Sequence, residues 1–262
     1  EPFAGGAGAA LGLLFSGKVE RIVINDLDKA IYSFWLSAIY ESEKFIRKIY
    51  ATPITIAEWK KQREIYRNVK SDTFRLGFAT FFLNRTNISG ILDGGPIGGL
   101  DQKGKWKVDA RFNKKNLAAK IRRIALHKER IFVSQKDGLD LIGKYLDKKN
   151  AFIYLDPPYY EKGRDLYYDF YQPDDHEKVQ KFVTRELSRK RWVVSYDNVA
   201  AIRARYKGFR QITYGIGYSA HNAREGSEAI FFSDSMQMSA LVGPFRLIRG
   251  ANGQHSRRSI QP

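Results

Sequence analysis

The chain has 262 residues, enough for one large domain or two small ones, and it has no cysteine. It therefore holds no disulfide framework, thiolate metal site, iron–sulfur cluster or cysteine nucleophile. Lys and Arg outnumber Asp and Glu by 45 to 28, and the net charge of +17 attracts polyanions, above all nucleic acid. An apolar fraction of 43% argues against wholesale disorder, and no apolar run approaches the ~18 residues of a membrane span.

The N-terminal part predicts a turn, a helix, a strand and a second helix. The glycines of Gly5-Gly6-Ala7-Gly8 predict a tight turn, followed by a helix over 9–15, a β-branched strand over 21–24 and a helix over 28–36. Nothing near Glu1-Pro2-Phe3 resembles a signal peptide. Because the chain opens there without Met, we expect that an upstream segment is missing.

The middle of the chain differs in kind from its flanks. Residues 39–67 predict helix, residues 73–83 are apolar, and residues 88–104 hold six glycines and Pro96, which predict a loop or hairpin. Residues 101–130 carry eleven basic and three acidic side chains, almost half of the net charge in about a ninth of the length. We expect this basic stretch to be part of an insertion into the α/β pattern.

Strands and helices alternate from residue 130 onward. The predicted strands cover 130–133, 151–155, 192–195, 209–214 and 228–232, and the predicted helices cover 138–146, 173–187 and 199–206. This alternation predicts an α/β fold, with a mostly parallel sheet and helices on both of its faces. Residues 236–262 predict a loose tail.

Two features of the N-terminal part suit a nucleoside-containing cofactor. Glycines at a strand-to-helix junction let the backbone approach a ligand closely, and no Gly-Lys-Ser/Thr follows as in a Walker loop. Asp26 stands at the end of the next strand, 18 residues beyond Gly8, where a carboxylate can accept hydrogen bonds from ribose hydroxyls. The structural alternatives are an ordinary turn and a helix N-cap at Asp26.

A third feature follows the predicted strand 151–155. Asp156-Pro157-Pro158-Tyr159 stands at the carboxyl end of that strand, where open α/β sheets bind their ligands. The two prolines make the backbone rigid, the carboxylate before them is a fixed acceptor, and the aromatic ring after them is a stacking surface. Together they suit a planar base that carries an amino group.

With these motifs in this order, the chain resembles the DNA adenine-N6 methyltransferases of the Dam or D12 class. The matching segments are Pro2 to Gly8, with the glycines shifted by one residue, Asp26, Asn84-Arg85-Thr86-Asn87-Ile88-Ser89-Gly90, Asp137, Asp156 to Tyr159, and Ser195-Tyr196-Asp197. The resemblance covers about residues 1–233. The sequence departs from the family pattern in two places. The strand, the glycine-rich turn and the cofactor-contacting lysine that precede the position of Glu1 in the family are absent from it, and the Phe that precedes Asn-Gly in the family's recognition segment is replaced, since Thr86 to Gly90 stands there.

The resemblance implies a Rossmann-like catalytic domain of residues 1–38 and 127–235, which binds S-adenosyl-L-methionine. It also implies an inserted target-recognition subdomain of residues 39–126, mainly helical and basic with a hairpin, followed by the tail 236–262. The cofactor-binding residues that it implies are Glu1, Pro2, Phe3, Gly5, Gly6, Ala7, Gly8, Asp26, Leu27, Asp137 and Asp156.

The implied reaction is direct methyl transfer to the N6 amino group of an adenine rotated out of the DNA duplex. The catalytic residues are then Asp156, Pro157, Pro158 and Tyr159. Tyr159 stacks on the flipped base, while the Asp156 carboxylate and the Pro157 carbonyl accept the two amino hydrogens. No metal is required, and the four histidines are scattered without metal-ligand spacing.

Double-stranded DNA is the partner that the charge and the resemblance both favour. The expected DNA contacts are Asn84, Arg85, Lys103, Lys105, Lys107, Arg111, Lys114, Lys115, Arg122 and Arg123. The lysines and arginines would bind phosphates, which gives affinity and salt dependence rather than sequence choice. The resemblance further implies a cytoplasmic bacterial, archaeal or phage-encoded protein, a monomer or transient dimer, with a cognate restriction endonuclease where the two form a restriction-modification pair.

Two other functions stay open from the sequence. A catalytically impaired DNA-binding relative would keep the basic insertion, and RNA would also be attracted by its charge. A nicotinamide-dependent oxidoreductase would use Gly6, Gly8 and Gly12 with Asp26, but it leaves the Asp-Pro-Pro-Tyr motif and the basic insertion unexplained.

Overall fold

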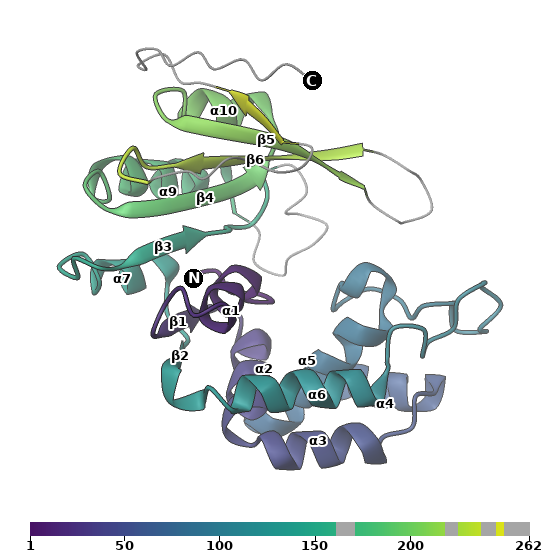
Figure 1. The fold of residues 1–262 in the computed structure, drawn as a ribbon. Helices are drawn as coiled ribbons and strands as arrows, with labels where there is room; N and C mark the ends of the chain where they lie inside the picture. The colour runs from purple at the N-terminus through teal and green to yellow at the C-terminus, as the bar shows by residue number, and fades with distance from the viewer. Residues whose placement is uncertain (161–170, 218–224, 237–244, 249–262) are drawn as a thin grey trace, which may run out of the picture. The chain divides into compact units, whose positions relative to one another are not determined.

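The computed structural model describes residues 1–160, 171–217, 225–236 and 245–248, and the chain forms two compact units, Glu1–Leu141 and Ile142–Pro262 (Figure 1). The first unit contains α1 (Gly8–Phe15), β1 (Ile22–Asn25), α2 (Lys29–Tyr40), α3 (Ser42–Ala51), α4 (Ile56–Asn68), α5 (Thr73–Thr86), η1 (Ile88–Gly90), α6 (Lys114–Ala125), η2 (Lys128–Arg130), β2 (Ile131–Ser134) and the start of α7 (Gly138–Gly143).

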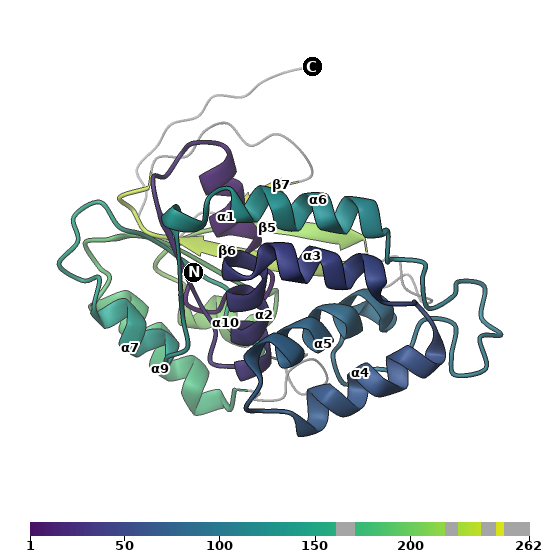
Figure 2. The same ribbon diagram turned by 90° about the horizontal axis from the view of Figure 1, so that it is seen from below.

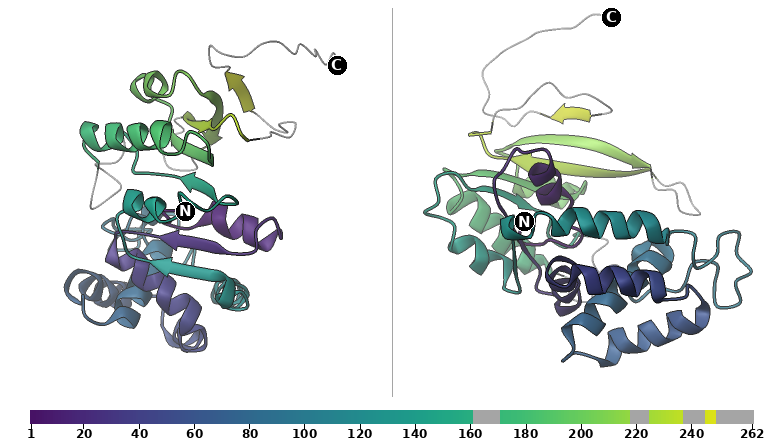
Figure 3. Two further views of the ribbon diagram at one scale, coloured as in Figure 1. Left: turned by 90° about the vertical axis from the view of Figure 1, so that its left-hand side faces the viewer. Right: turned by 60° about the horizontal axis from the view of Figure 1, so that its bottom comes forward.

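The strands of the first unit form a small parallel sheet. β1 pairs with β2 from Ile22 opposite Ile131 to Asn25 opposite Ser134, and Figure 3 shows the two arrows side by side. Because the strands are parallel, their carboxyl ends meet at one edge. A hydrophobic core of small and branched residues, which includes Ala7, Leu14 and Ile24, joins α1 to this sheet.

The helices of the first unit share a second, aromatic core. Phe34 of α2 stacks on Phe81 of α5, and Phe45 of α3 meets Phe78 and Phe81 edge-on or tilted at 5.2–5.4 Å between ring centres. In Figure 2, α3 runs beside α6 and α4 beside α5. At Gly77 of α5 a Cβ atom would lie 2.3 Å from the backbone oxygen of Ser33, so only glycine lets α2 and α5 approach this closely.

The second unit is a five-stranded mixed sheet. Its elements are β3 (Phe152–Leu155), α9 (Pro173–Arg185), β4 (Arg191–Asp197), α10 (Ala200–Arg205), β5 (Arg210–Gly217), β6 (Glu225–Phe232) and β7 (Phe245–Ile248), with strand order β3-β4-β6-β5-β7. β3 and β4 are parallel, whereas the β4–β6, β5–β6 and β5–β7 pairs are antiparallel.

The expectation of a mostly parallel sheet is therefore wrong for this unit. Seven residues separate Gly217 from Glu225, and a parallel crossover needs a dozen or more, so β5 and β6 can only pair as antiparallel neighbours. The expectation of a loose tail is wrong at Phe245–Ile248, which forms β7 against β5. The other strands lie within three residues of their predicted bounds.

Helices α9 and α10 cover one face of this sheet. Tyr196 of β4 contacts His176 of α9, and Tyr206 at the end of α10 stacks on Phe231 of β6 with ring centres 4.6 Å apart. Alternation along β4 turns Ser195 away from this helix-covered face. The α/β class is thus confirmed, while the predicted division into a catalytic domain and a recognition subdomain of residues 39–126 stays a prediction.

The predicted hairpin of residues 88–104 begins with backbone pairing rather than a regular strand. Ile88 N–H donates to the Gly95 carbonyl and Ile97 N–H to that of Thr86, and Asn87 and Pro96 form an isolated antiparallel bridge. Across the described ranges, the helices are too short or too polar to pass through a bilayer.

Candidate active site

The candidate functional residues of the first unit begin with the turn that precedes α1. The backbone of Glu1 exchanges hydrogen bonds with Val23 and Asn25 of β1 at 2.9 and 3.0 Å, which is the pattern of a parallel ladder. The chain then reverses through Gly5 and Ala7, both with positive φ, and enters α1. The predicted glycine turn therefore lies at a strand-to-helix junction, as a ligand-binding loop requires.

Glu1 has a local structural role in this turn. Its carboxylate accepts a hydrogen bond from the Ala10 N–H at 2.8 Å, which satisfies one of the free amides at the start of α1. The exposed Gly5, Gly6 and Gly8 have open space where a Cβ atom would stand. Their backbone is thus the part of the turn that a ligand can approach.

Asp26 fixes the backbone around this turn by accepting hydrogen bonds on both of its carboxylate oxygens. Oδ2 accepts the Gly5 N–H at 2.8 Å and Oδ1 accepts the Asp28 N–H at 3.0 Å. Burial raises the pKa of Asp26 from 3.8 to about 6, although the two backbone hydrogen bonds oppose the shift. The N-cap of α2 is Asp28, which accepts the Ala30 N–H, so the N-cap alternative for Asp26 is wrong.

Asn25 is the residue that sequence reasoning missed in this unit. It is 1% exposed, and its Nδ2 donates to the carbonyls of Pro2 and Lys136 at 2.9 and 2.8 Å. Its Oδ1 accepts from the Ser134 hydroxyl and the Lys136 N–H. One buried amide therefore ties the loop after Glu1 to the loop after β2, and its place at the end of a strand, beside Asp26, was the available signal.

Phe3 and Asp137 come together at the same edge of the small sheet. A Cβ atom on Gly138 would lie 2.7 Å from Cζ of Phe3, so the Phe3 ring rests directly on this glycine. Asp137 precedes it, and its Oδ1 accepts the N–H groups of Leu139 and Asp140 as the cap of α7. Leu27 is 54% exposed beside Asp26. An apolar ring, an exposed leucine and carboxylate acceptors fit a nucleoside.

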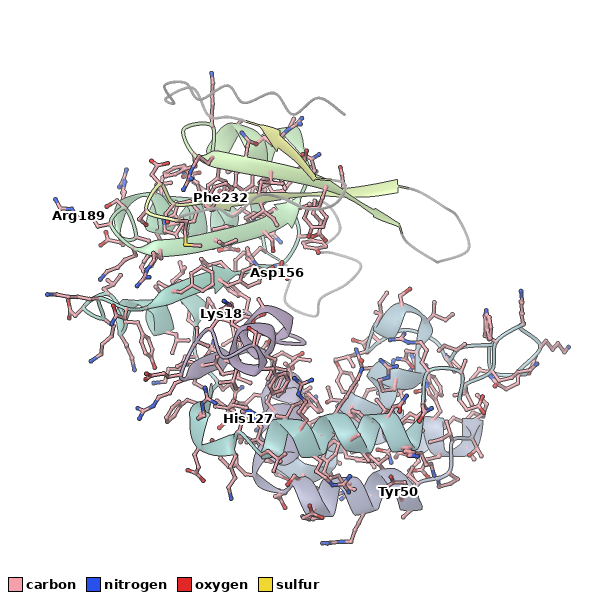
Figure 4. All side chains as sticks on the ribbon, in the orientation of Figure 1. Lys18, Tyr50, His127, Asp156, Arg189 and Phe232 are labelled. Atoms are coloured by element: carbon pink, nitrogen blue, oxygen red, sulfur yellow. The ribbon has the colours of Figure 1, made fainter. Side chains whose placement is uncertain are left out.

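The candidate functional residues of the second unit lie at the carboxyl end of β3, where Figure 4 labels Asp156. The Ser195 hydroxyl of β4 donates to Oδ1 of Asp156 at 2.6 Å, and the Tyr154 hydroxyl lies 3.1 Å from the same Ser195 oxygen. Among the described residues, no hydrogen bond reaches the other oxygen of Asp156. This carboxylate is thus held in place while one oxygen keeps its acceptor capacity.

Burial raises the pKa of Asp156 from 3.8 to about 6. The Ser195 hydrogen bond opposes this shift, and the negative charge of Glu228 adds to it. A half-buried carboxyl group with such a pKa is a candidate for chemistry rather than for a surface ion pair.

Tyr159 is anchored at its hydroxyl. It donates to Oε1 of Glu228 on β6 at 2.7 Å, and the Tyr214 hydroxyl of β5 donates to the other oxygen of Glu228. The backbone after the motif is fixed as well, because the Tyr160 N–H donates to the buried Asp197 at 2.9 Å. Sequence reasoning did not assign Glu228, Tyr214 or Tyr154 to the site, since only the sheet register brings them to the motif.

The expected DNA contacts all belong to the first unit, and several of them hold the loop that follows α5. Arg85 donates two hydrogen bonds to the Arg111 carbonyl at 3.0 and 2.7 Å, and Asn84 donates to the Gly90 carbonyl at 3.1 Å. Lys107 and Lys114 also donate to backbone carbonyls, those of Gln102 and Tyr50. These side chains already hold the backbone through hydrogen bonds, so any contact with DNA would add to this structural role.

The remaining basic residues are better placed to meet a phosphate. Lys103, Lys105, Lys115, Arg122 and Arg123 are exposed. Lys105 lies 5.8 Å from the ring centre of Trp106, which is itself 65% exposed. Within the described part of the chain, no group of three or more His, Asp or Glu side chains could hold a metal ion.

One family model covers candidate residues of both units. The family model of the D12 class N6 adenine-specific DNA methyltransferases matches residues 1–215, which include the glycine turn, Asp26 and the Asp-Pro-Pro-Tyr motif. Among curated proteins, no significant match to the chain is found.

Proposed function

Because the chain belongs to the D12 class N6 adenine-specific DNA methyltransferases, we propose that its first unit holds the methyl donor and that Asp156 and Tyr159 hold the adenine. The protein is an enzyme that methylates the N6 amino group of adenine at specific sites in DNA. Its family generally uses S-adenosylmethionine. The residues that bind the cofactor and the base are the part that we propose.

The residues of the glycine turn fit such a cofactor. The open backbone at Gly5, Gly6 and Gly8 admits its methionine end, and Asp26 can accept ribose hydroxyls through lone pairs that its two backbone donors leave. Phe3, Leu27 and Asp137 would contact its adenine. When bound, S-adenosylmethionine supplies an electrophilic methyl group on a positively charged sulfur.

Asp156 would act on the amino group of the target adenine. An aromatic amino nitrogen is a poor nucleophile because its lone pair is delocalised into the ring. Two acceptors, the Asp156 carboxylate and the Pro157 carbonyl, would favour a pyramidal nitrogen and stabilise its developing positive charge. The ionised form of Asp156 is the active one, since a protonated carboxyl loses this charge.

Tyr159 would receive the base once it has left the duplex. Rotating a nucleotide out of the stack costs a few kcal/mol. Stacking on an aromatic side chain returns about 1–3 kcal/mol of this. Pro157 and Pro158, which lie between Asp156 and Tyr159, keep the acceptor and the stacking ring in a fixed relation.

The exposed lysines and arginines of the first unit would bind the phosphates of double-stranded DNA. The contribution is electrostatic, so it would weaken as salt is added. We further propose that residues 39–126 act as the target-recognition subdomain. Family membership counts against a nicotinamide-dependent oxidoreductase.

One observation carries the proposed site: the Ser195 hydroxyl holds Oδ1 of Asp156 at 2.6 Å and leaves the other oxygen as an acceptor. The test is transfer of a labelled methyl group to DNA by Asp156→Ala. We expect a loss of at least about a hundredfold, as for removal of one transition-state hydrogen-bonding group elsewhere. Asp147→Ala removes an exposed carboxylate shortly before β3 and should leave activity unchanged. Full activity of Asp156→Ala would overturn the proposed role.

A further inference from the structure

Glu228 connects two tyrosines through its two carboxylate oxygens. Oε1 accepts from Tyr159 at 2.7 Å, and Oε2 accepts from Tyr214. Tyr159 follows the prolines of the motif, whereas Tyr214 is part of a regular strand. The carboxylate therefore joins a residue at the end of the motif to the rigid framework of the sheet.

The sheet register fixes where this carboxylate lies. Glu228 stands opposite Tyr214 on β5 and opposite Asp197 on β4, so β6 presents it between two strands on one face. Asp197 in turn accepts the N–H of Tyr160, the next residue after the motif. Both the ring and the backbone at this point are thus held by acidic side chains from neighbouring strands.

Restraint at the hydroxyl matters for a stacking ring. The χ2 torsion of tyrosine is broad, so an unrestrained ring samples many orientations. A phenolic O–H prefers the plane of its ring, and an acceptor fixed on the sheet therefore limits both the position and the rotation of that ring. A ring that is already oriented loses less entropy when a planar base stacks on it.

We propose that Glu228 is a positioning residue for the target purine, which acts by holding Tyr159 in the orientation that stacks on the base. Tyr214 supports this arrangement by occupying the second carboxylate oxygen. The inference rests on the proposed roles of Asp156 and Tyr159 in binding the adenine. Glu228 touches neither the donor nor the base in this account.

The charge of Glu228 has a separate, measurable effect. It raises the pKa of Asp156, the group that must be ionised for activity. Glu228→Gln removes the charge but keeps the length of the side chain, one acceptor oxygen for one tyrosine and an amide that can donate to the other. Glu228→Ala removes both. The two variants therefore separate orientation from charge.

The decisive experiment is a double-mutant cycle between Glu228→Ala and Tyr159→Phe, measured as kcat and KM on DNA that carries the methylation site found by sequencing. We expect each single variant to lower kcat/KM about tenfold, and the double variant to be no worse than the poorer single one. Replacing the target adenine by 2-aminopurine should give a weaker fluorescence increase on binding in all three variants. Independent, additive losses would overturn the inference.

The pH–rate profile of Glu228→Gln is a measurement that a merely structural role of Glu228 would leave unchanged. This variant should recover most of kcat at pH 8, and the acid limb of its pH–rate profile should lie at lower pH than in the unaltered enzyme. An unshifted limb, or no recovery over Glu228→Ala, contradicts the proposal. Glu186→Ala, at an exposed position of the same unit, is the matched control.

Asp156→Ala distinguishes this inference from the proposed site itself. If Asp156→Ala stays active, the premise fails and both proposals are overturned. If Asp156→Ala is inactive while the Glu228–Tyr159 cycle is additive, only the role of Glu228 is overturned. S-adenosylmethionine affinity by calorimetry should be unchanged in the Glu228 variants, and a loss of affinity there would contradict an action through Tyr159.

Discussion

Asp26 and Asp156 are two half-buried carboxylates that follow strands, and burial raises the pKa of each to about 6. They differ in what holds them. Asp26 receives backbone N–H groups on both oxygens, from Gly5 and Asp28. Asp156 receives one side-chain hydroxyl, from Ser195, on one oxygen.

The difference separates a carboxylate that shapes a loop from one for which we propose a catalytic role. The donors on Asp26 are backbone N–H groups on both sides of it, so its two oxygens fix the backbone that surrounds the proposed donor site. Asp156 keeps an oxygen without a described donor, which is what an incoming amino group needs. Equal pKa shifts thus accompany different functions, and geometry distinguishes them.

The largest expected effect comes from exchanging each carboxylate for an amide. Asp156→Asn should lose at least about a hundredfold in methyl transfer, with little loss of stability, because Asn still accepts from Ser195. Asp26→Asn should lose about 1–3 kcal/mol of unfolding free energy, since an amide cannot accept on both sides and leaves a backbone donor unpaired. Urea unfolding and methyl transfer on both variants check this. The reverse pattern would contradict the comparison.

A variant of Asn25 tests the same comparison within the first unit. Asn25→Ala removes a buried amide that joins the Pro2 and Lys136 loops, and it should cost about 1–3 kcal/mol of unfolding free energy. It should also weaken S-adenosylmethionine binding while leaving kcat at saturating donor nearly unchanged. Asn68→Ala, at an exposed helix end, is the control. A fall in kcat at saturating donor would show that the proposed roles of the two units are not separable in this way.

The pH dependence tests Asp156 with a smaller change. In the proposed mechanism the ionised form of Asp156 is the active one, so kcat should rise with pH through about 6. Ser195→Ala removes the hydrogen bond that opposes the shift, and its acid limb should move to higher pH, opposite to the limb of Glu228→Gln. If Ser195→Ala leaves the acid limb of the pH–rate profile unchanged, that limb reports the ionisation of another group.

The pH dependence of folding stability should be opposite to that of activity. The folded-state pKa values of Asp26 and Asp156 lie above their ordinary value of 3.8, so folding favours the protonated forms. Their contribution to stability is fully present below about pH 4 and is lost as pH rises through about 6. Asp156→Asn should therefore show a flatter dependence of Tm on pH in this window. An unchanged dependence would contradict the burial of its charge.

The smallest expected effect concerns the exposed lysines of the first unit. Replacing Lys103, Lys105 and Lys115 by Ala should reduce the slope of log Kd against log salt by about one for each lysine that contacts a phosphate. The control variants replace Lys44, Lys178 and Lys181, which form ion pairs with nearby acidic side chains. Equal slopes for both sets would place the DNA elsewhere.

Much of the fold could be predicted because its signals are local. β-Branched and apolar runs gave most of the strands, and Pro53 separates α3 from α4 within the predicted helical stretch. The sheet direction was mispredicted because it depends on the length of the β5–β6 connection, which alternation alone does not reveal. The Phe245–Ile248 strand was missed because it is short and pairs only through β5.

The candidate site residues also divide into those that local sequence predicts and those that it does not. Motif spacing predicted Asp26 and Asp156, each directly after a strand. Their partners are distant in sequence, as Ser195 is from Asp156 and Glu228 from Tyr159, and only strand pairing makes them neighbours. The lesson is that short motifs indicate the reactive groups, while the residues that orient them come from the register of the sheet.

The glycine at position 77 carries a consequence for target recognition. A single methyl group there would act as a wedge between α2 and α5, because the space is already filled by the backbone at Ser33. The C-terminal end of α5 carries Asn84 and Arg85, whose side chains donate hydrogen bonds to backbone carbonyls of the segment that follows α5. A helix displaced at its middle would move that end, so if residues 39–126 act in target recognition as proposed, the choice of DNA sequence would depend on a residue that no nucleotide needs to touch.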